Sequence, residues 1–345
     1  MTNRANIWVR ASVRTCRKLI AFICACTLSA SWMAHGQIFV ADYGNGRIGE
    51  YRLDGTPGNR ALITGFSGPC GITSDGNGHL FVADYPGTIG EYTTSGAAVN
   101  ASLITGLSWP RRPILDADGN LYVLNTYSAS IGQYTAGGQA VRVPLVGSAF
   151  LDSPSAFAID GNGFMYVAND RLGCIELFTT SGQLVNPFFI PHLNTPEGLA
   201  LDGQGHLFVA DWGANLIGEY TTSGETVDAS LLTGLSSPTS VALDVQGHMF
   251  VANQSSGTVG EYTMDGETVN ASLISGLSSP QDLVIVVPEP SSVVLLVLGA
   301  PILALRRRVR QPTIAPHPTP RRGVLTYQKL AARREGARVA GHISS

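Results

Sequence analysis

Histidine is the side chain that most often binds metal ions in proteins, and three histidines of this chain share one sequence pattern. His79, His206 and His248 each stand four residues after an Asp, as in the segment Asp-Gly-Gln-Gly-His at 202–206. If the fold brought the three rings together, they would suit zinc or another transition metal. A second candidate is the segment Asp-Ala-Asp-Gly-Asn at 116–120, which has oxygen ligands in the order of a calcium loop but lacks the late Glu.

A second group of residues combines aromatic rings with side chains of both charge signs. Flat rings beside hydrogen-bonding groups suit the binding of a sugar or a peptide. The alternative is that the rings only cover the ends of strands. The group consists of large residues at positions where related segments of the chain have small ones: Tyr43, Tyr85, Trp109, Arg111, Arg112, Asp170, Arg171, Glu197, Trp212, Gln281 and Asp282.

All these residues belong to one stretch of about forty residues that the chain repeats six times. The clearest copy, Pro196 to Leu235, contains short strand signals at 198–201, 207–210, 217–220 and 229–232, separated by turns rich in Gly, Asp and Asn. An aromatic residue before Val marks each copy at intervals of 41 to 44 residues: Phe39, Phe81, Tyr122, Tyr166, Phe208 and Phe250. Four antiparallel strands repeated six times predict an all-β fold, a six-bladed β-propeller.

The first and last copies are incomplete in complementary ways. Residues 37–42 form a second strand without a first, and residues 280–287 form a first strand without a second. We predict that 282–287 pairs with the N-terminal strands and closes the ring, which leaves no open sheet edge between the first and last blades. Although 345 residues would allow two domains, residues 37–287 are expected to form one.

The repeat argues against both metal sites. The three histidines occupy the same position in three different blades, so they are expected to lie far apart and to serve in turns. The segment 116–120 corresponds to the turn between the first and second strands of the other copies. An Asp or Asn such as Asp42, Asp84 or Asp211 follows each second strand, and we expect it to accept hydrogen bonds from the following loop. We therefore expect no catalytic residue, no metal and no cofactor.

The charge of the predicted propeller limits the class of partner that it can bind. Residues 37–287 hold 7 Arg, no Lys and 23 Asp and Glu, a formal net charge of −16. An acidic body repels phosphate groups, which argues against nucleic acid as a partner.

Cys70 and Cys174 fall in non-adjacent blades and are expected to be free, buried thiols. We expect a monomer.

Residues 1–36 have the pattern of a secretion signal. An apolar run, 19–33, leads to small residues before Gln37. A membrane anchor is the alternative, but the run is short and a strand follows at once. The basic residues ahead of the run are Arg4, Arg10, Arg14, Arg17 and Lys18.

The repeat resembles that of the NHL-repeat propellers. The matching segments are Pro-x-Gly-Leu-Ala-Leu-Asp at 196–202, Gly-His-Leu-Phe-Val-Ala-Asp at 205–211 and Ile-Gly-Glu-Tyr at 217–220. Because these are strand and turn residues, the resemblance implies a fold and not a function. Similar propellers include gluconolactonase-type hydrolases and lyases that cleave peptidyl-hydroxyglycine, whose metal ligands converge on the channel. The inner strands here show no such set of His or carboxylate side chains.

The segment after the repeat resembles a PEP-CTERM sorting signal, the tag of bacterial exosortase substrates. Residues 291–305 are apolar and would span about 22 Å as a helix, against a hydrocarbon core of about 30 Å. An ordinary tail anchor is the alternative. The residues that carry the resemblance are Pro288, Glu289 and Pro290 before this run and Arg306, Arg307 and Arg308 after it.

This resemblance implies an exosortase-type partner and transient retention in the inner membrane through 291–305. It further implies transfer to the cell surface or extracellular matrix of a Gram-negative-type bacterium. Residues 311–345 continue beyond the usual end of such signals, and their Pro-, Arg- and Ala-rich composition predicts a disordered basic tail.

Two classes of function follow. The first is an exported, non-catalytic propeller that binds extracellular polysaccharide or a surface protein as a scaffold. The second is a metal-dependent propeller enzyme of the gluconolactonase or peptidyl-hydroxyglycine lyase type. We favour the first, because no set of metal ligands or catalytic residues converges in the sequence pattern.

Overall fold

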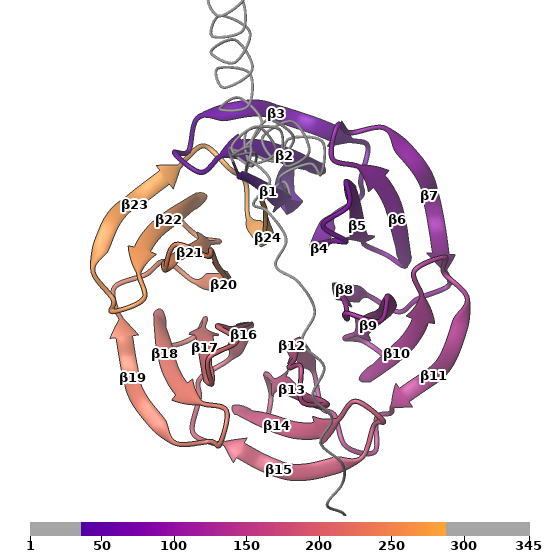
Figure 1. Ribbon diagram of the computed structural model, residues 1–345, viewed down its shortest axis with the longest axis vertical. Coiled ribbons are helices and arrows are strands. Elements are labelled where there is room, and N and C mark those ends of the chain that lie inside the picture. Colours follow the sequence, from indigo (N-terminus) through magenta and orange to yellow (C-terminus); the bar gives the residue numbers. More distant parts are fainter. Residues whose placement is uncertain (1–35, 288–345) are drawn as a thin grey trace, which may run out of the picture. The chain divides into compact units, whose positions relative to one another are not determined.

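A computed structural model describes residues 36–287, which form a ring of six four-stranded antiparallel sheets around a central axis (Figure 1). This confirms the predicted all-β, six-bladed propeller. The described residues contain one short 3-10 helix, η1 (Tyr43–Asn45). The predicted sorting motif, membrane segment and basic tail, and the predicted secretion signal apart from Gly36, lie outside the described residues. No helix within 36–287 is long and apolar enough to cross a membrane.

Each blade runs from an inner strand at the axis to an outer strand at the periphery, in chain order except that the last strand, β24, is the inner strand of blade 1 (Figure 1). Blade 1 holds β24 (Pro280–Val286), β1 (Gln37–Asp42), β2 (Arg47–Arg52) and β3 (Pro57–Thr64). Blade 2 holds β4 (Pro69–Ser74), β5 (His79–Asp84), β6 (Thr88–Thr93) and β7 (Ala98–Thr105). Blade 3 holds β8 (Pro110–Leu115), β9 (Asn120–Asn125), β10 (Ser130–Thr135) and β11 (Ala140–Val146).

The remaining blades follow the same plan. Blade 4 holds β12 (Pro154–Ile159), β13 (Phe164–Asn169), β14 (Cys174–Thr179) and β15 (Leu184–Ile190). Blade 5 holds β16 (Pro196–Leu201), β17 (His206–Asp211), β18 (Leu216–Thr221) and β19 (Thr226–Leu232). Blade 6 holds β20 (Pro238–Leu243), β21 (His248–Asn253), β22 (Thr258–Thr263) and β23 (Thr268–Ile274). The strands extend one to three residues beyond the predicted segments of the clearest copy.

The apolar core lies between neighbouring blades. Second strands such as β17 are buried over most of their length because blades pack on both of their faces, whereas outer strands such as β19 are mostly exposed. In one cluster Phe208 of blade 5 packs with Met249 and Val251 of blade 6. Each blade therefore buries its apolar side chains against its neighbours, which is why the ring needs every blade.

The ring closes as predicted. Strand β24 pairs with β1 in antiparallel register, with Val40 opposite Leu283 and Phe39 opposite Val284. Leu283 is 4% exposed and belongs to a cluster shared by blades 1 and 6. Residues from both ends of the repeat region thus complete one blade.

Glycine in the third strand lets a tyrosine ring fold back over the backbone. A Cβ on Gly218 would lie 2.9 Å from Cε2 of Tyr220 and 3.2 Å from the carbonyl oxygen of Ala229. Blade 4 breaks this pattern, because its third strand has Glu176 in the glycine position and Phe178 in the tyrosine position.

Candidate functional site

Five of the predicted site residues lie on inner strands at the centre of the ring. Arg111 and Arg112 are on β8, Glu197 is on β16, and Gln281 and Asp282 are on β24. The predicted segment 198–201 began two residues too late, because β16 starts at Pro196 and includes Glu197. In every blade except blade 3, the pairing of the inner strand with the second strand shifts register directly after the inner strand's first proline, as between Pro196 and Gly198. The strand therefore includes the residue that follows the proline.

The residues that directly follow these prolines form a first polar layer. Arg111, Glu197 and Gln281 come from alternate blades 3, 5 and 1 and meet across the axis. Arg111 Nη1 lies 2.7 Å from Glu197 Oε2, and Arg111 Nη2 donates to Gln281 Oε1 at 3.4 Å. These three residues are called the first polar layer below.

The other three blades carry small residues at this position. Cys70 and Thr239 donate to the carbonyl oxygen of the first proline of the next blade, each at 2.9 Å, and Ser155 does the same. Three blade-to-blade hydrogen bonds therefore alternate with the three long side chains of the first polar layer. Because Cys70, Ser155 and Thr239 have small side chains, the space at the axis is free for the long side chains of the first polar layer.

The next residue is polar in three of the inner strands. These three residues, Arg112, Ser240 and Asp282, form a second polar layer. Arg112 Nη1 lies 2.7 Å from Asp282 Oδ1 and donates to Ser240 Oγ at 3.2 Å. The other Asp282 oxygen accepts the backbone N–H of Ile72 at 3.0 Å. The side chains of Arg112 and Asp282 are 11% and 7% exposed, less than those of Arg111 and Glu197 at 17% and 15%.

Charge compensation governs this centre. Burial is the largest single influence on Arg111 and lowers its pKa, but the neighbouring groups together, led by the Glu197 carboxylate, raise the pKa of Arg111 overall. The pKa of Asp170 is also raised, first by burial and then by the charge of Glu197. We expected no converging carboxylates on the inner strands, but Glu197 and Asp282 both lie at the axis, each paired with an arginine. An oxygen atom of each carboxylate is therefore already occupied by a hydrogen bond from a side chain of another blade.

The remaining predicted residues form a rim on the same face. Backbone hydrogen bonds join each loop that leads into an inner strand to the loop after the second strand, as from Trp212 N to Thr195 O. Tyr85 and Trp109 stack edge to face with centroids 5.6 Å apart and are 41% and 39% exposed. Trp212 is 37% exposed and donates to Gln254 at 2.9 Å. The rim consists of Tyr43, Tyr85, Trp109, Asp170, Arg171 and Trp212.

A cavity of ≈ 620 Å³ opens on the rim between blades 4 and 5, and its lining includes Asp170, Arg171 and Asn194. Arg171 also forms an exposed ion pair with Asp152 at 3.4 Å. Tyr43 is half-buried, and its ring would contact a Cβ on Gly68 at 2.5 Å. The structure thus brings Tyr85 and Trp109 together but leaves Tyr43 largely packed inside.

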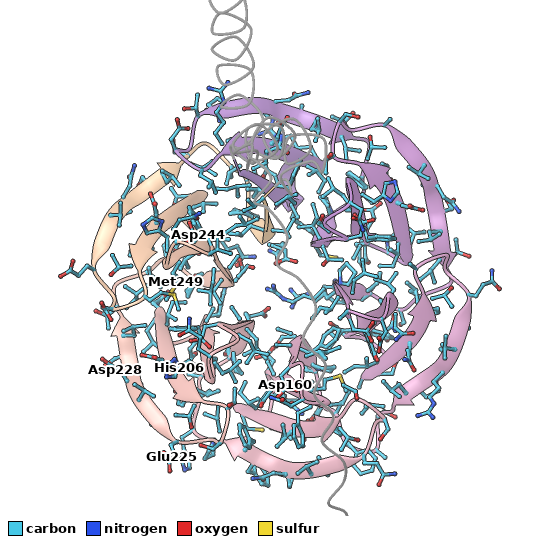
Figure 2. The ribbon with its side chains drawn as sticks, in the orientation of Figure 1. Asp160, His206, Glu225, Asp228, Asp244 and Met249 are labelled. Carbon is cyan, nitrogen blue, oxygen red and sulfur yellow. The ribbon has the colours of Figure 1, made fainter. Side chains whose placement is uncertain are left out.

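The three histidines lie in separate blades, as predicted. Figure 2 labels one of them, His206 of blade 5. Each Nδ1 contacts the Asp four residues earlier and a Glu of the third strand in its own blade. For His206 the distances are 2.9 Å to Asp202 and 3.7 Å to Glu219. No group of three His, Cys, Asp or Glu side chains in 36–287 is placed to hold a metal ion.

The repeated carboxylates also serve the backbone. In the segment 116–120, Asp116 Oδ1 accepts the N–H groups of Asp118 and Asn120, so the segment is a turn as predicted. Asp84, after a second strand, accepts from the N–H groups of Ser67 and Gly68. Those donors lie in the loop before the inner strand. Asp211 accepts a hydrogen bond from Asn194 in the equivalent loop and another from Ala214 in the following loop, which is the contact that we expected. Cys70 and Cys174 are free and buried, as predicted.

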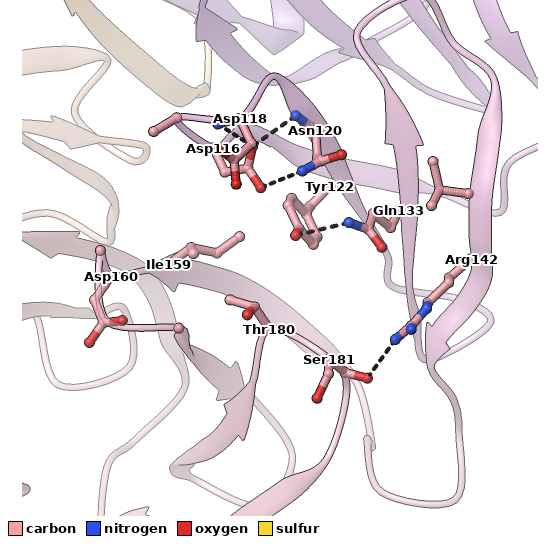
Figure 3. A pocket seen from close by; sticks show the side chains of 14 residues that line it. Asp116, Asp118, Asn120, Tyr122, Gln133, Arg142, Ile159, Asp160, Thr180 and Ser181 are labelled. Carbon is pink, nitrogen blue, oxygen red and sulfur yellow. Dashed lines mark hydrogen bonds between the residues drawn. The ribbon is translucent and has the colours of Figure 1, made fainter.

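Sequence reasoning missed a cleft of ≈ 530 Å³ between blades 3 and 4 (Figure 3). Its lining includes Tyr122, whose hydroxyl accepts from Gln133 Nε2 at 3.1 Å, and Arg142. Burial, and then the charge of Asp116, raise the pKa of Tyr122 to about 12, so its hydroxyl stays protonated. The available signal was that blade 3 has Gln133 where four other blades have Glu.

Comparison with known proteins agrees with this architecture. A chain in the crystal structure of a nidogen/laminin complex superposes with a TM-score of 0.63 at 14% identity, covering 74% of this chain and 99% of that chain. A protein of unknown function from Bacteroides caccae gives 0.57 at 14% identity, covering 73% and 99%. A streptogramin B lyase structure gives 0.51 at 24% identity, covering 64% and 73%.

These likenesses establish the fold alone. No curated protein sequence matches the chain. The family model described as the virginiamycin B lyase family matches residues 25–293, which is more than half of the sequence and includes the whole ring. The chain therefore belongs to the virginiamycin B lyase family.

Proposed function

We propose that this propeller is a non-catalytic binding module that holds an extracellular polysaccharide at its rim, above the first polar layer. The observation that carries the proposal is the exposed edge-to-face pair of Tyr85 and Trp109, on the face where Arg111 and Glu197 meet. Large apolar side chains are normally buried, so rings left this exposed on one face support a binding role.

The chemistry of the rim suits sugars. An aromatic face covers the C–H side of a sugar ring, while neighbouring polar groups bond its hydroxyls. Trp212 and the adjacent residues Asp170 and Arg171 border the same face, so a ligand could contact more than one blade. The net charge of −16 over 37–287 favours a neutral or cationic ligand over a strongly anionic one.

We further propose that the chain is exported, retained briefly in the inner membrane through 291–305 and then sorted by an exosortase-type enzyme to the cell surface or matrix. The support is the pattern of residues 1–36 and 288–310. A rigid ring displayed there would act as a scaffold on polysaccharide, with a surface protein as the other class of partner.

Replacing both Trp109 and Trp212 by Ala should weaken retention on the native exopolysaccharide at least ~10-fold, or ~1.4 kcal/mol, because stacking area is lost. Both rings are more than a third exposed, so the melting temperature should not fall. Co-sedimentation with the polysaccharide and thermal unfolding measure the two effects.

The matched control is Val245→Ala, which removes an apolar side chain that is 83% exposed and lies in a turn between the first and second strands of blade 6. It should retain full binding. Unchanged retention of the Trp109→Ala, Trp212→Ala protein would reject the rim as the polysaccharide-binding site. Loss of binding to a purified surface protein, with polysaccharide retention intact, would assign the rim to a protein partner.

Family membership favours a second candidate, a lyase acting on a virginiamycin B-like substrate. An elimination needs a positioned base that can reach the substrate, and both central carboxylates are already engaged in ion pairs with arginines. Turnover of virginiamycin B by the purified chain, together with stoichiometric zinc or calcium, would favour this candidate. We expect no turnover and no stoichiometric metal.

A further inference from the structure

One blade departs from the ring at its centre. The third position of the inner strands is small or short in the other five blades (Gly71, Ala156, Gly198, Ser240 and Asp282), whereas blade 3 places Arg112 there. Arg112 has a φ of +42°, and the register of β8 and β9 shifts between Arg111 and Ile114 instead of behind the proline. A left-handed backbone and a displaced bulge together direct this long side chain across the axis.

The neighbouring blade makes room for this geometry. A Cβ on Gly71 would lie 2.4 Å from the backbone nitrogen of Arg112 and 2.7 Å from Cδ of Pro113. Only glycine leaves enough space for so close an approach of β8.

The guanidinium of Arg112 is surrounded by oxygen atoms from three blades. Nη1 faces the Asp282 carboxylate at 2.7 Å and the Ser240 hydroxyl at 3.2 Å. Nη2 donates to the carbonyl oxygens of Glu197 at 2.8 Å, of Gln281 at 3.5 Å and of Thr239. Ser240 in turn donates to Asp282 at 2.7 Å, which fixes the carboxylate.

This set of one carboxylate, one hydroxyl and three carbonyl groups is what a hard cation takes as ligands. We propose that the second polar layer is a cation-binding cage whose resident cation is the guanidinium of Arg112, which closes the centre of the ring where a free cation would otherwise bind. The cage joins blade 3 to blades 5, 6 and 1, so its occupant ties one blade to three blades that lie across the axis. This inference does not depend on the ligand proposed for the rim.

The test removes the resident cation and supplies another. Arg112→Ala in the full chain should lower the melting temperature by roughly 10 °C, because Asp282 and three carbonyl groups lose their partner. Methylguanidinium chloride at millimolar concentration should then raise the melting temperature of this variant with saturation, as a bound ligand does. Calcium chloride is the second probe for the same cage.

Three controls make the result specific. The wild type and Arg142→Ala, which removes an exposed arginine bonded to the carbonyl of Ser181, should gain nothing from either cation. Adding Asp282→Asn to Arg112→Ala should abolish the gain. Stabilisation of Arg112→Ala by either cation, lost with Asp282→Asn, supports the cage; no stabilisation by either cation overturns it.

A second pair of variants covers the case in which Arg112→Ala does not fold. Arg112→Lys keeps the charge and Arg112→Met keeps a similar length without it. The Lys variant should melt several degrees above the Met variant. Equal melting temperatures of the two would show that the cage has no need of a cation and would overturn the proposal.

Discussion

Replacing Leu283 by Asp should lower the free energy of unfolding by more than about 4 kcal/mol and prevent the ring from closing. Leu283 lies opposite Val40 in the pairing of β24 with β1 and is 4% exposed. Removing a buried leucine costs about 2–5 kcal/mol, and an unpaired carboxylate in an apolar cluster adds several more. Because β24 is the strand that pairs with the inner side of β1, the loss falls on the contact that completes the ring.

Urea unfolding followed by circular dichroism measures this effect, and Val287→Asp is its control. Val287 directly follows β24 and is 41% exposed, so its replacement should change the free energy of unfolding by no more than about 0.5 kcal/mol. If Leu283→Asp unfolds at the wild-type urea concentration, pairing of the two ends does not hold the ring together.

The blades could be predicted from the sequence because their determinants are local. The turn at 116–120 repeats in other blades with Asp in its first position, and in the structure that Asp caps two backbone N–H groups. Strand alternation and turn chemistry recur at nearly constant spacing, so each copy supports the others. The pairing of β24 with β1 could be predicted by counting strands, because the first copy lacks a first strand and the last copy ends after its first strand.

The centre of the ring could not be predicted in the same way, because it depends on residues that meet from blades far apart in the sequence. Arg111 and Glu197 are separated by 86 positions, yet they form an ion pair. Copy-by-copy comparison singled out both residues as unusual, but it gave no distance between them. The shifted bulge at Arg112 has no marker in the strand pattern beyond the second proline, Pro113.

Blade 4 holds another feature that the repeat concealed. Its third strand reads Cys-Ile-Glu-Leu-Phe where blade 5 has Leu-Ile-Gly-Glu-Tyr, so an acid occupies a position that is otherwise glycine. Glu176 is 2% exposed and accepts a hydrogen bond from Asn169 Nδ2 at 3.3 Å. Burial raises the pKa of Glu176 from 4.5 to about 7, and the bond from Asn169 opposes the rise.

Glu176→Gln should therefore stabilise the protein above neutral pH and leave it unchanged in acid. The folded state keeps a proton on Glu176 that the unfolded state releases from about pH 4.5 upward, so the free energy of unfolding falls as pH rises to about 7 and stays low above it. The loss amounts to at most about 3 kcal/mol. Gln stays neutral at every pH, keeps an oxygen for Asn169 and avoids this loss.

Urea unfolding of both proteins at pH 5 and at pH 8.5 measures the effect, since all other carboxyl groups titrate equally in the two and cancel in the difference. The matched control is Glu225→Gln, in an exposed turn at the periphery of blade 5 (Figure 2). Its difference from the wild type should be within about 0.5 kcal/mol at both pH values. A Glu176→Gln protein with no greater advantage at pH 8.5 than at pH 5 would mean that Glu176 is ionised in the folded ring and that its burial is compensated.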